Sequence, residues 1–178
     1  MSMNTLRLLL RPWCENDADA LYKYARDPEI GPRCGWMPHT SCENSLAVIR
    51  TVLARPGCWA VTLKETGEVI GSVSLMRGDA AHAPLTDTEA EIGYWIARPY
   101  WGQGYACEAA QRIIRYAFSD LSCTALWCGY HDGNDQSRRV SEKCGFRYHH
   151  TNRLEFIPQL GCHKTVHYTR LLPTEKQA

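Results

Sequence analysis

The sequence predicts one α+β domain with a mixed sheet, spanning residues 1–178. Three observations support this prediction. Two strand-like segments early in the chain flank a short Gly-containing turn, which is typical of a hairpin. A strongly amphipathic helix pattern lies near the middle, and strand and helix patterns alternate after it. Hairpins followed by strand–helix–strand–helix–strand indicate a mixed sheet, not a doubly wound fold.

The first elements follow from periodicity and capping residues. Apolar and other residues alternate over 6–11, which predicts a first strand. Asn16 or Asp17 can cap a helix that runs through Tyr24. Residues 27–40 are rich in Pro and Gly and predict a loop, after which Ser41 can open a second helix. The hairpin strands cover residues 59–63 and 69–75.

The second half begins with a polar loop over residues 77–87 and a strand over 90–96. Apolar residues then recur at three- and four-residue spacing from Ala106 to Phe118, which predicts the clearest helix. The remaining predicted elements are a short buried strand at 125–128, a helix at 134–144 ended by Gly145, a strand opened by Phe146 and a strand at 163–172. We expect the last few residues to form a flexible tail.

Composition indicates an ordinary globular protein. Hydrophobic residues make up 44% of the chain and charged residues 22%, and the formal net charge is +1. That charge gives no reason to expect nucleic acid or a membrane surface as a partner. The apolar run near the start is too short for a signal peptide or a membrane span, so we expect a cytoplasmic protein.

The nine cysteines include no C-x-x-C pair. We therefore expect reduced thiols, most of them buried as small core residues. His163 and His167 have a metal-like spacing, but no cysteine pair precedes them at zinc-finger distance, and we expect no metal site.

A glycine-rich segment lies between the strand at 90–96 and the central helix. Gly102 and Gly104 remove side chains where the backbone must approach another group, and the helix start offers free N–H groups. Such a site suits a pyrophosphate, although the two glycines alone are equally consistent with a tight turn. A Walker A motif is absent, and Cys107 stands where a dinucleotide fingerprint needs Gly or Ala.

Together with its neighbours, this segment resembles the acetyl-CoA motif of the GNAT N-acetyltransferase superfamily. The residues that carry the likeness are AEIGYWI at 90–96 and YWGQGYA at 100–106. Trp101 replaces the Gln or Arg of the general motif, and this version is typical of the RimJ/RimL-like branch. A second match, NDQS at 134–137 followed by Val140, Glu142, Lys143 and Gly145-Phe146, is also similar to that branch.

The resemblance implies a GNAT-type fold, with a central, mostly antiparallel, splayed sheet flanked by helices. It also implies acetyl-CoA as cosubstrate. Backbone N–H groups would hold the pyrophosphate, residues 92–96 would pair with the pantetheine, and an N–H near Trp95 or Ile96 would support the oxyanion. The implied cofactor-binding residues are Trp95, Ile96, Trp101, Gly102, Gln103, Gly104, Tyr105, Ala106, Cys107 and Asn134.

The resemblance implies two catalytic residues. Glu91 would accept the proton of the attacking amine, with Glu89 as the alternative on the same face of the strand. Ser137 would assist departure of the CoA thiolate. The wider family places a Tyr there at the position of Ser141, and a water or a Tyr such as Tyr130 are the other options. A solvated carboxylate and ordinary helix capping are the structural alternatives for Glu91 and Ser137.

The acceptor is a primary amine in the implied reaction, recognised by loops at 27–43, 77–87 and 151–163. A protein N-terminus, a free amino acid, a polyamine and an aminoglycoside all remain open, as does a homodimer. Two other functions are alternatives: a non-catalytic acyl-CoA sensor, and an acyltransferase that uses another acyl-CoA.

Overall fold

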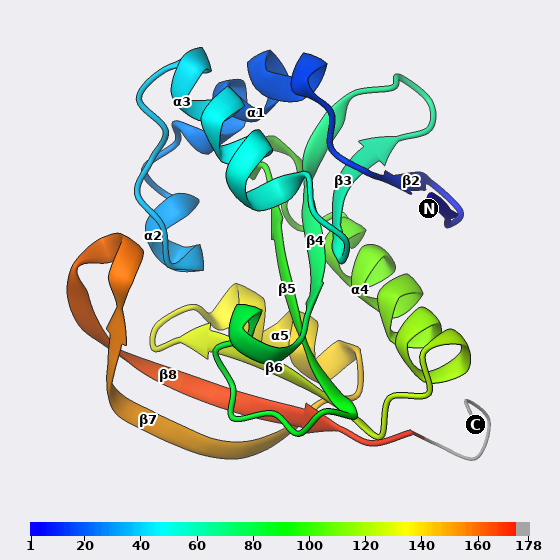
Figure 1. Ribbon diagram of the computed structural model, residues 1–178, viewed down its shortest axis with the longest axis vertical. Helices are drawn as coiled ribbons and strands as arrows, with labels where there is room; N and C mark the ends of the chain where they lie inside the picture. The colour runs from blue at the N-terminus through cyan, green and yellow to red at the C-terminus, as the bar shows by residue number, and fades with distance from the viewer. Residues whose placement is uncertain (174–178) are drawn as a thin grey trace.

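The computed structural model describes residues 1–173, and its strands form one sheet in the order β1-β2-β3-β4-β5-β6-β8-β7 (Figure 1). The strands are β1 (Met3–Asn4), β2 (Leu8–Arg11), β3 (Cys58–Leu63), β4 (Val69–Met76), β5 (Glu89–Ile96), β6 (Ala125–His131), β7 (Arg147–Ile157) and β8 (Cys162–Leu171). All neighbouring pairs are antiparallel except β5 and β6. The predicted mixed, mostly antiparallel sheet is confirmed. The flexible tail that we expected falls largely in residues 174–178, outside the described residues.

Five α-helices accompany the described strands: α1 (Ala18–Ala25), α2 (Gly31–Cys34), α3 (Cys42–Val48), α4 (Tyr105–Arg115) and α5 (Asp135–Lys143). One π-helical turn continues α3 over Ile49–Leu53, and another continues α4 over Tyr116–Asp120. Ser41 caps α3 as predicted, because its hydroxyl accepts the N–H of Asn44. Figure 1 shows α1 and α3 together at one end of the molecule, with α4 beside β4 and β5.

The two faces of β5 bury different clusters. Ile92 and Ile96 pack with Ile113 of α4 in the largest core cluster, whereas Trp95 packs against the cluster that contains Leu21 of α1. This division follows from the two-residue period of a strand. Ile113 is completely buried, and burial of one such side chain stabilises the fold by roughly 1.5–3 kcal/mol. These clusters hold β5 firmly against α4 on one face and α1 on the other.

Close packing also explains a glycine in β4. Gly71 pairs with Ile96, and a Cβ at this position would overlap the carbonyl oxygen of Trp95. Only glycine therefore lets β4 approach the end of β5 this closely.

The structure corrects several predicted boundaries. The segment 27–40 is not all loop, because it contains the single helical turn of α2. Most of the expected loop at 151–163 is strand β7, and β6 extends to His131 instead of ending at Cys128. β7 lies at the sheet edge and is largely exposed, so it carries no alternation of buried residues that periodicity could detect.

The cysteines also differ from expectation. Only Cys58, Cys123 and Cys128 are buried, whereas the other six are half-buried or exposed. All nine thiols are free, but most are not core residues.

Within residues 1–173, no helix has both the length and the apolar character needed to cross a bilayer.

Candidate active site

The two parallel strands β5 and β6 separate near the middle of the sheet. Their pairing ends at Glu91 and Trp127, although β5 continues to Ile96 and β6 continues to His131. Beyond that point each strand is paired only on its outer side, β5 with β4 and β6 with β8. The inner edge of residues 92–96 is therefore free of β6 and can accept an added strand-like ligand.

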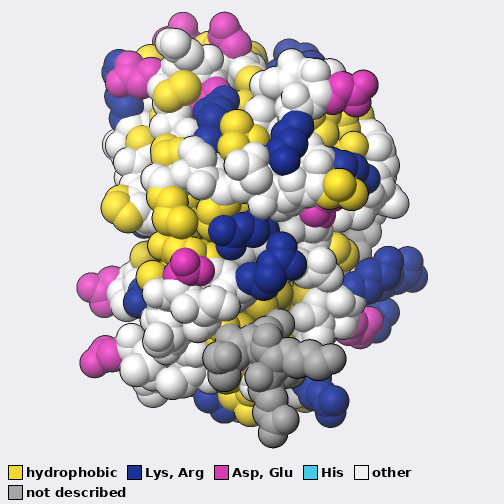
Figure 2. Space-filling model, turned by 90° about the vertical axis from the view of Figure 1, so that its right-hand side faces the viewer, with side chains coloured by type: hydrophobic (Ala, Val, Ile, Leu, Met, Phe, Trp, Pro, Cys, Tyr) yellow, Lys and Arg dark blue, Asp and Glu magenta, His cyan; other side chains and the backbone are white. Residues whose placement is uncertain are grey.

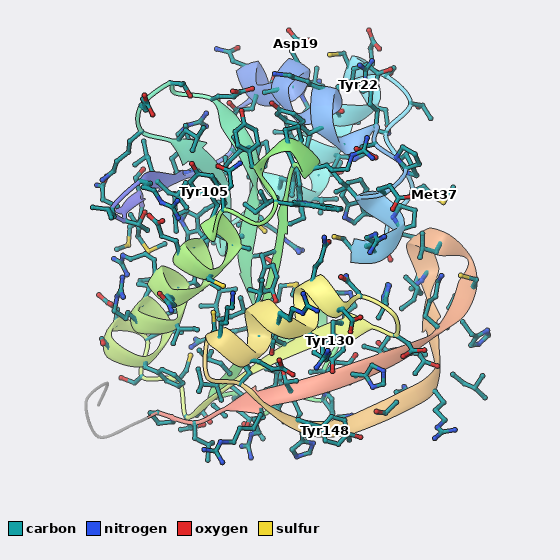
Figure 3. All side chains as sticks on the ribbon, turned by 180° about the vertical axis from the view of Figure 1, so that it is seen from behind. Asp19, Tyr22, Met37, Tyr105, Tyr130 and Tyr148 are labelled. Atoms are coloured by element: carbon teal, nitrogen blue, oxygen red, sulfur yellow. The ribbon has the colours of Figure 1, made fainter. Side chains whose placement is uncertain are left out.

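Helix α4 begins next to the open end of this gap. Gly102 and Gly104 both have left-handed backbone conformations, with φ of 76° and 83°. Gly104 is the N-cap and offers no capping side chain, so the first N–H groups of α4 have no side-chain cap. Tyr105, Ala106 and Cys107 form that first turn, and Figure 3 shows Tyr105 at its start. Free N–H groups and the helix dipole make this turn an anion-binding site.

Arg7, the residue before β2, contacts the same turn. Its guanidinium group donates a hydrogen bond of 3.0 Å to the carbonyl of Gln103 and lies 4.2 Å from the ring centroid of Tyr105. It also pairs with Glu108 of α4 at 2.7 Å. Figure 2, which views the side of the molecule that carries α4, shows basic side chains scattered among acidic and neutral ones. Arg7 is a residue that our sequence reasoning missed, since 96 positions separate it from Gln103.

Trp101 and Trp95 shape the surroundings of the gap. The indole N–H of Trp101 donates to the carbonyl of Ile96 at 2.6 Å and so closes the turn after β5. On the other face of the sheet, the ring of Trp95 meets Trp36 edge to face at 6.0 Å. Arg33 of α2 lies 5.9 Å from the ring centroid of Trp101. The chain just after α2 therefore packs on the Trp95 face of β5, which is the face opposite α4.

Asn134 links the start of α5 to this segment. Its side-chain oxygen accepts the N–H of Ser137 at 3.2 Å, which makes it the N-cap of α5, and its amide donates to the carbonyl of Arg33 at 3.3 Å. Asn134 therefore acts as an ordinary helix cap in this structure.

Ser137 lies in the first turns of α5, facing β5. Its hydroxyl is 3.2 Å from the hydroxyl of Tyr94, and the Tyr94 hydroxyl donates to the Ser137 carbonyl at 3.1 Å. Burial is the main cause that raises the pKa of Tyr94 well above its usual range, so this phenol stays protonated. The Cys128 thiol lies 3.8 Å from the Tyr94 hydroxyl. Tyr94 is the second residue that the sequence reasoning missed as a partner of the site.

Ser141 has a different environment from Ser137, although both stand on α5 four residues apart. It is buried, and its hydroxyl lies 2.8 Å from that of Thr169 in β8. Thr169 in turn donates to the carbonyl of Cys128 at 2.9 Å. Tyr130, the other alternative, lies with its ring 5.1 Å from that of His167 (Figure 3).

Glu91 is buried at the last paired position of β5, on the face opposite Ser137. One carboxylate oxygen, Oε2, accepts the backbone N–H groups of His82 at 2.6 Å and of Ala83 at 2.9 Å. The other oxygen, Oε1, lies 3.7 Å from Nδ1 of His82. Glu91 is therefore not the solvated carboxylate of the structural alternative, but a buried group held by the loop before β5.

Glu89 is also buried, and it forms an ion pair with Arg170 of β8. Burial would raise the pKa of its carboxyl, but the N–H of Thr86 and the guanidinium of Arg170 outweigh burial and lower it. Glu89 is thus engaged in a structural pair and is a weaker base than a free carboxylate.

A family model described as an acetyltransferase (GNAT) domain matches residues 7–147. The chain is 30% identical over 151 residues to the uncharacterized N-acetyltransferase p20 of Bacillus licheniformis, covering 82% of each protein. A GNAT-family acetyltransferase structure from Bacillus anthracis superposes with a TM-score of 0.84 at 22% identity, covering 97% of this chain and 98% of that chain. Spermidine N-acetyltransferase from Vibrio cholerae, solved with CoA and spermine, gives a TM-score of 0.73 at 21% identity, covering 93% of this chain and 95% of that one.

The family match spans most of the chain and includes the α4 turn, the separated strands and α5 up to Ser137 and beyond. The chain therefore belongs to the GNAT family and is an acetyl-CoA-dependent N-acetyltransferase.

Proposed function

We propose that this enzyme transfers the acetyl group of acetyl-CoA to a primary amine by direct attack within a ternary complex. The observation that carries the proposal is the parting of β5 and β6 after Glu91 and Trp127, with candidate catalytic groups on both faces of the opening. Glu91 lies on one face and Ser137 on the other, so an amine and a thioester can meet between them.

The cofactor would enter along the free edge of β5. The N–H groups of the first turn of α4 suit the pyrophosphate, and the backbone of residues 92–96 suits the amide groups of pantetheine. An N–H near Trp95 or Ile96 would stabilise the oxyanion that forms when the amine attacks the thioester carbonyl. Trp101 and Asn134 would border the pantetheine arm.

Proton transfer would be divided between the two faces. An alkylammonium has a pKa near ~10.4, so a base is needed to supply free amine at neutral pH. The acceptor face carries the buried carboxylate of Glu91, the predicted base, with the imidazole of His82 beside it. On the other face, the Ser137 hydroxyl, which lies 3.2 Å from the Tyr94 oxygen, would rotate to donate its hydrogen bond to the leaving thiolate.

The acceptor would approach from the face that carries Glu91. A hollow of about 540 Å³ opens between α2 and the ends of β6 and β8, and Asn134 is part of its lining. Its lining includes the acidic residues Glu29 and Asp132 and the basic residues Arg33 and Lys164. The spermidine enzyme of similar fold supports a polyamine as one acceptor class. The mixed lining supports a peptide N-terminus equally.

The test is CoA-thiol release from acetyl-CoA with four acceptors: spermine, a hexapeptide with a free N-terminal Ser, a free amino acid and an aminoglycoside. We expect release with at least one amine, and Glu91→Gln should lower kcat/KM about a hundredfold or more while acetyl-CoA affinity is unchanged. Tight acetyl-CoA binding without turnover for any amine would favour the sensor alternative. Faster turnover with succinyl-CoA would favour another acyl donor.

A further inference from the structure

We infer that His82 is the group that removes the proton from the acceptor amine, and that Glu91 acts through His82 as a positioning residue. The inference rests on the proposed function, because it assigns the base of that reaction. The observation behind it is the closed environment of the Glu91 carboxylate.

The Glu91 carboxylate has little capacity left to meet a substrate directly. Its side chain is only 6% exposed, and Oε2 already accepts two backbone N–H groups from the loop before β5. The remaining oxygen, Oε1, faces Nδ1 of His82 at 3.7 Å. An ammonium group that approached this oxygen would meet the imidazole first.

The imidazole of His82 is placed to meet the ammonium group of an acceptor. Its side chain is 53% exposed, whereas its Nδ1 faces the buried carboxylate. Within residues 1–173 no protein group forms a hydrogen bond to Nε2, so this nitrogen is available to a ligand. A carboxylate that holds one ring nitrogen while the other accepts a proton is a common arrangement of a catalytic histidine.

The charges around His82 also suit a base that works near neutral pH. Glu91 of β5 is the main cause that raises the pKa of the imidazole, and Glu155 of β7 adds to it. Burial and Arg55 oppose this rise, and His82 in turn helps to lower the pKa of the His131 imidazole in β6. Because the pKa is raised, His82 is protonated below it and becomes a proton acceptor only above it. A base with a pKa close to the working pH is the most effective.

The position of His82 fits the chemistry of the gap. Glu91 stands at the last β5–β6 pair, so the loop bound to it lies where the strands begin to separate, on the face opposite Ser137. In the step, an N–H bond of the ammonium breaks and an Nε2–H bond forms on His82. The amine lone pair then attacks the thioester carbonyl, the C–S bond breaks, and the second amine proton passes to the thiolate. His82 finally releases its proton to water.

The test compares His82→Gln and Glu91→Gln with His149→Gln, a control at an exposed histidine of β7 outside the acceptor hollow. Turnover is measured between pH 5.5 and 9 with whichever of spermine or the Ser hexapeptide is the better acceptor. We expect kcat/KM of the wild type to rise with pH through a limb at or above the usual histidine range. His82→Gln should remove that limb and lower kcat/KM about a hundredfold, with unchanged acetyl-CoA affinity by calorimetry. Glu91→Gln should keep the limb but move it to lower pH.

Imidazole added to His82→Ala should restore part of the rate if the ring itself carries the proton. An NMR titration of His82, which needs no activity, should show a pKa that falls in Glu91→Gln. Wild-type kcat/KM in His82→Gln, or an equal His82 pKa in the wild type and Glu91→Gln, would overturn the inference. A wild type that releases no CoA thiol with any amine, but whose His82 pKa still falls in Glu91→Gln, would instead refute acetyl transfer. The electrostatic coupling of Glu91 to His82 would then stand without the proposed reaction.

Discussion

The two serines of α5 should have separable effects when each is changed to Ala. Ser137→Ala removes a hydroxyl that meets only Tyr94, and it keeps the backbone N–H that Asn134 caps. We therefore expect a stability loss below about 1 kcal/mol. If Ser137 supports the thiolate, kcat should fall about tenfold to a hundredfold.

Ser141→Ala should show the opposite pattern. Thr169 donates its own proton to the Cys128 carbonyl, so in the 2.8 Å contact Ser141 is the donor and the Thr169 oxygen accepts. Removal of the Ser141 hydroxyl leaves the buried Thr169 oxygen without this donor, which lowers the free energy of unfolding by about 1–2 kcal/mol. For a domain of this size, that corresponds to a fall in Tm of roughly 2–8 °C. Turnover should change less than threefold.

The assay pairs thermal melts with thiol release at saturating acetyl-CoA and one amine. Thr169→Val is the matched control for the buried pair, because it removes the same contact without touching α5. It should lower Tm at least as much as Ser141→Ala does, because it also removes the hydrogen bond to the Cys128 carbonyl, and it should leave kcat nearly unchanged. A larger loss of kcat in Ser141→Ala than in Ser137→Ala, at equal Tm, would refute this reading of the two environments.

Three further outcomes are expected. Gly104→Asp should weaken acetyl-CoA binding in calorimetry by at least about tenfold, and more than Gly104→Ala, because it adds negative charge as well as a side chain at a left-handed N-cap. Tyr94→Phe should lower kcat about threefold to tenfold in the wild type but have no further effect in Ser137→Ala, and additive losses would separate the two residues. Arg7→Ala should raise the acetyl-CoA Kd several-fold without changing kcat, since it removes the brace on the Gln103 carbonyl, and an unchanged Kd would show that the turn holds without it.

Local patterns in the chain are sufficient to predict much of this molecule. The two-residue period of the early strands, the apolar stripe of α4 and the capping residues Ser41 and Asn134 are all short-range features. The glycine-rich turn before α4 and the Asn134–Ser137 segment together also predicted the family. Each of these signals needs only residues within one or two turns of each other.

Other features depended on contacts between distant residues. Nothing in the order of elements shows that β5 and β6 part after Glu91, because that depends on which outer strand holds each of them. Helical spacing placed Ser137 and Ser141 on one face, but their different partners come from β5 and β8. The sequence predicts a strand opened by Phe146 but not that β7 continues to Ile157, because its largely exposed residues leave no periodic pattern.

Contacts between distant residues also place the side chains around the proposed reaction site. Arg7, Tyr94 and His82 are common residue types in unremarkable local contexts, and each is placed by the sheet or by a loop that returns to it. A buried carboxylate takes its properties from the donors and charges that the fold brings within a few ångströms. The family resemblance of the sequence can therefore nominate Glu91, whereas only the folded chain shows that His82 lies beside it.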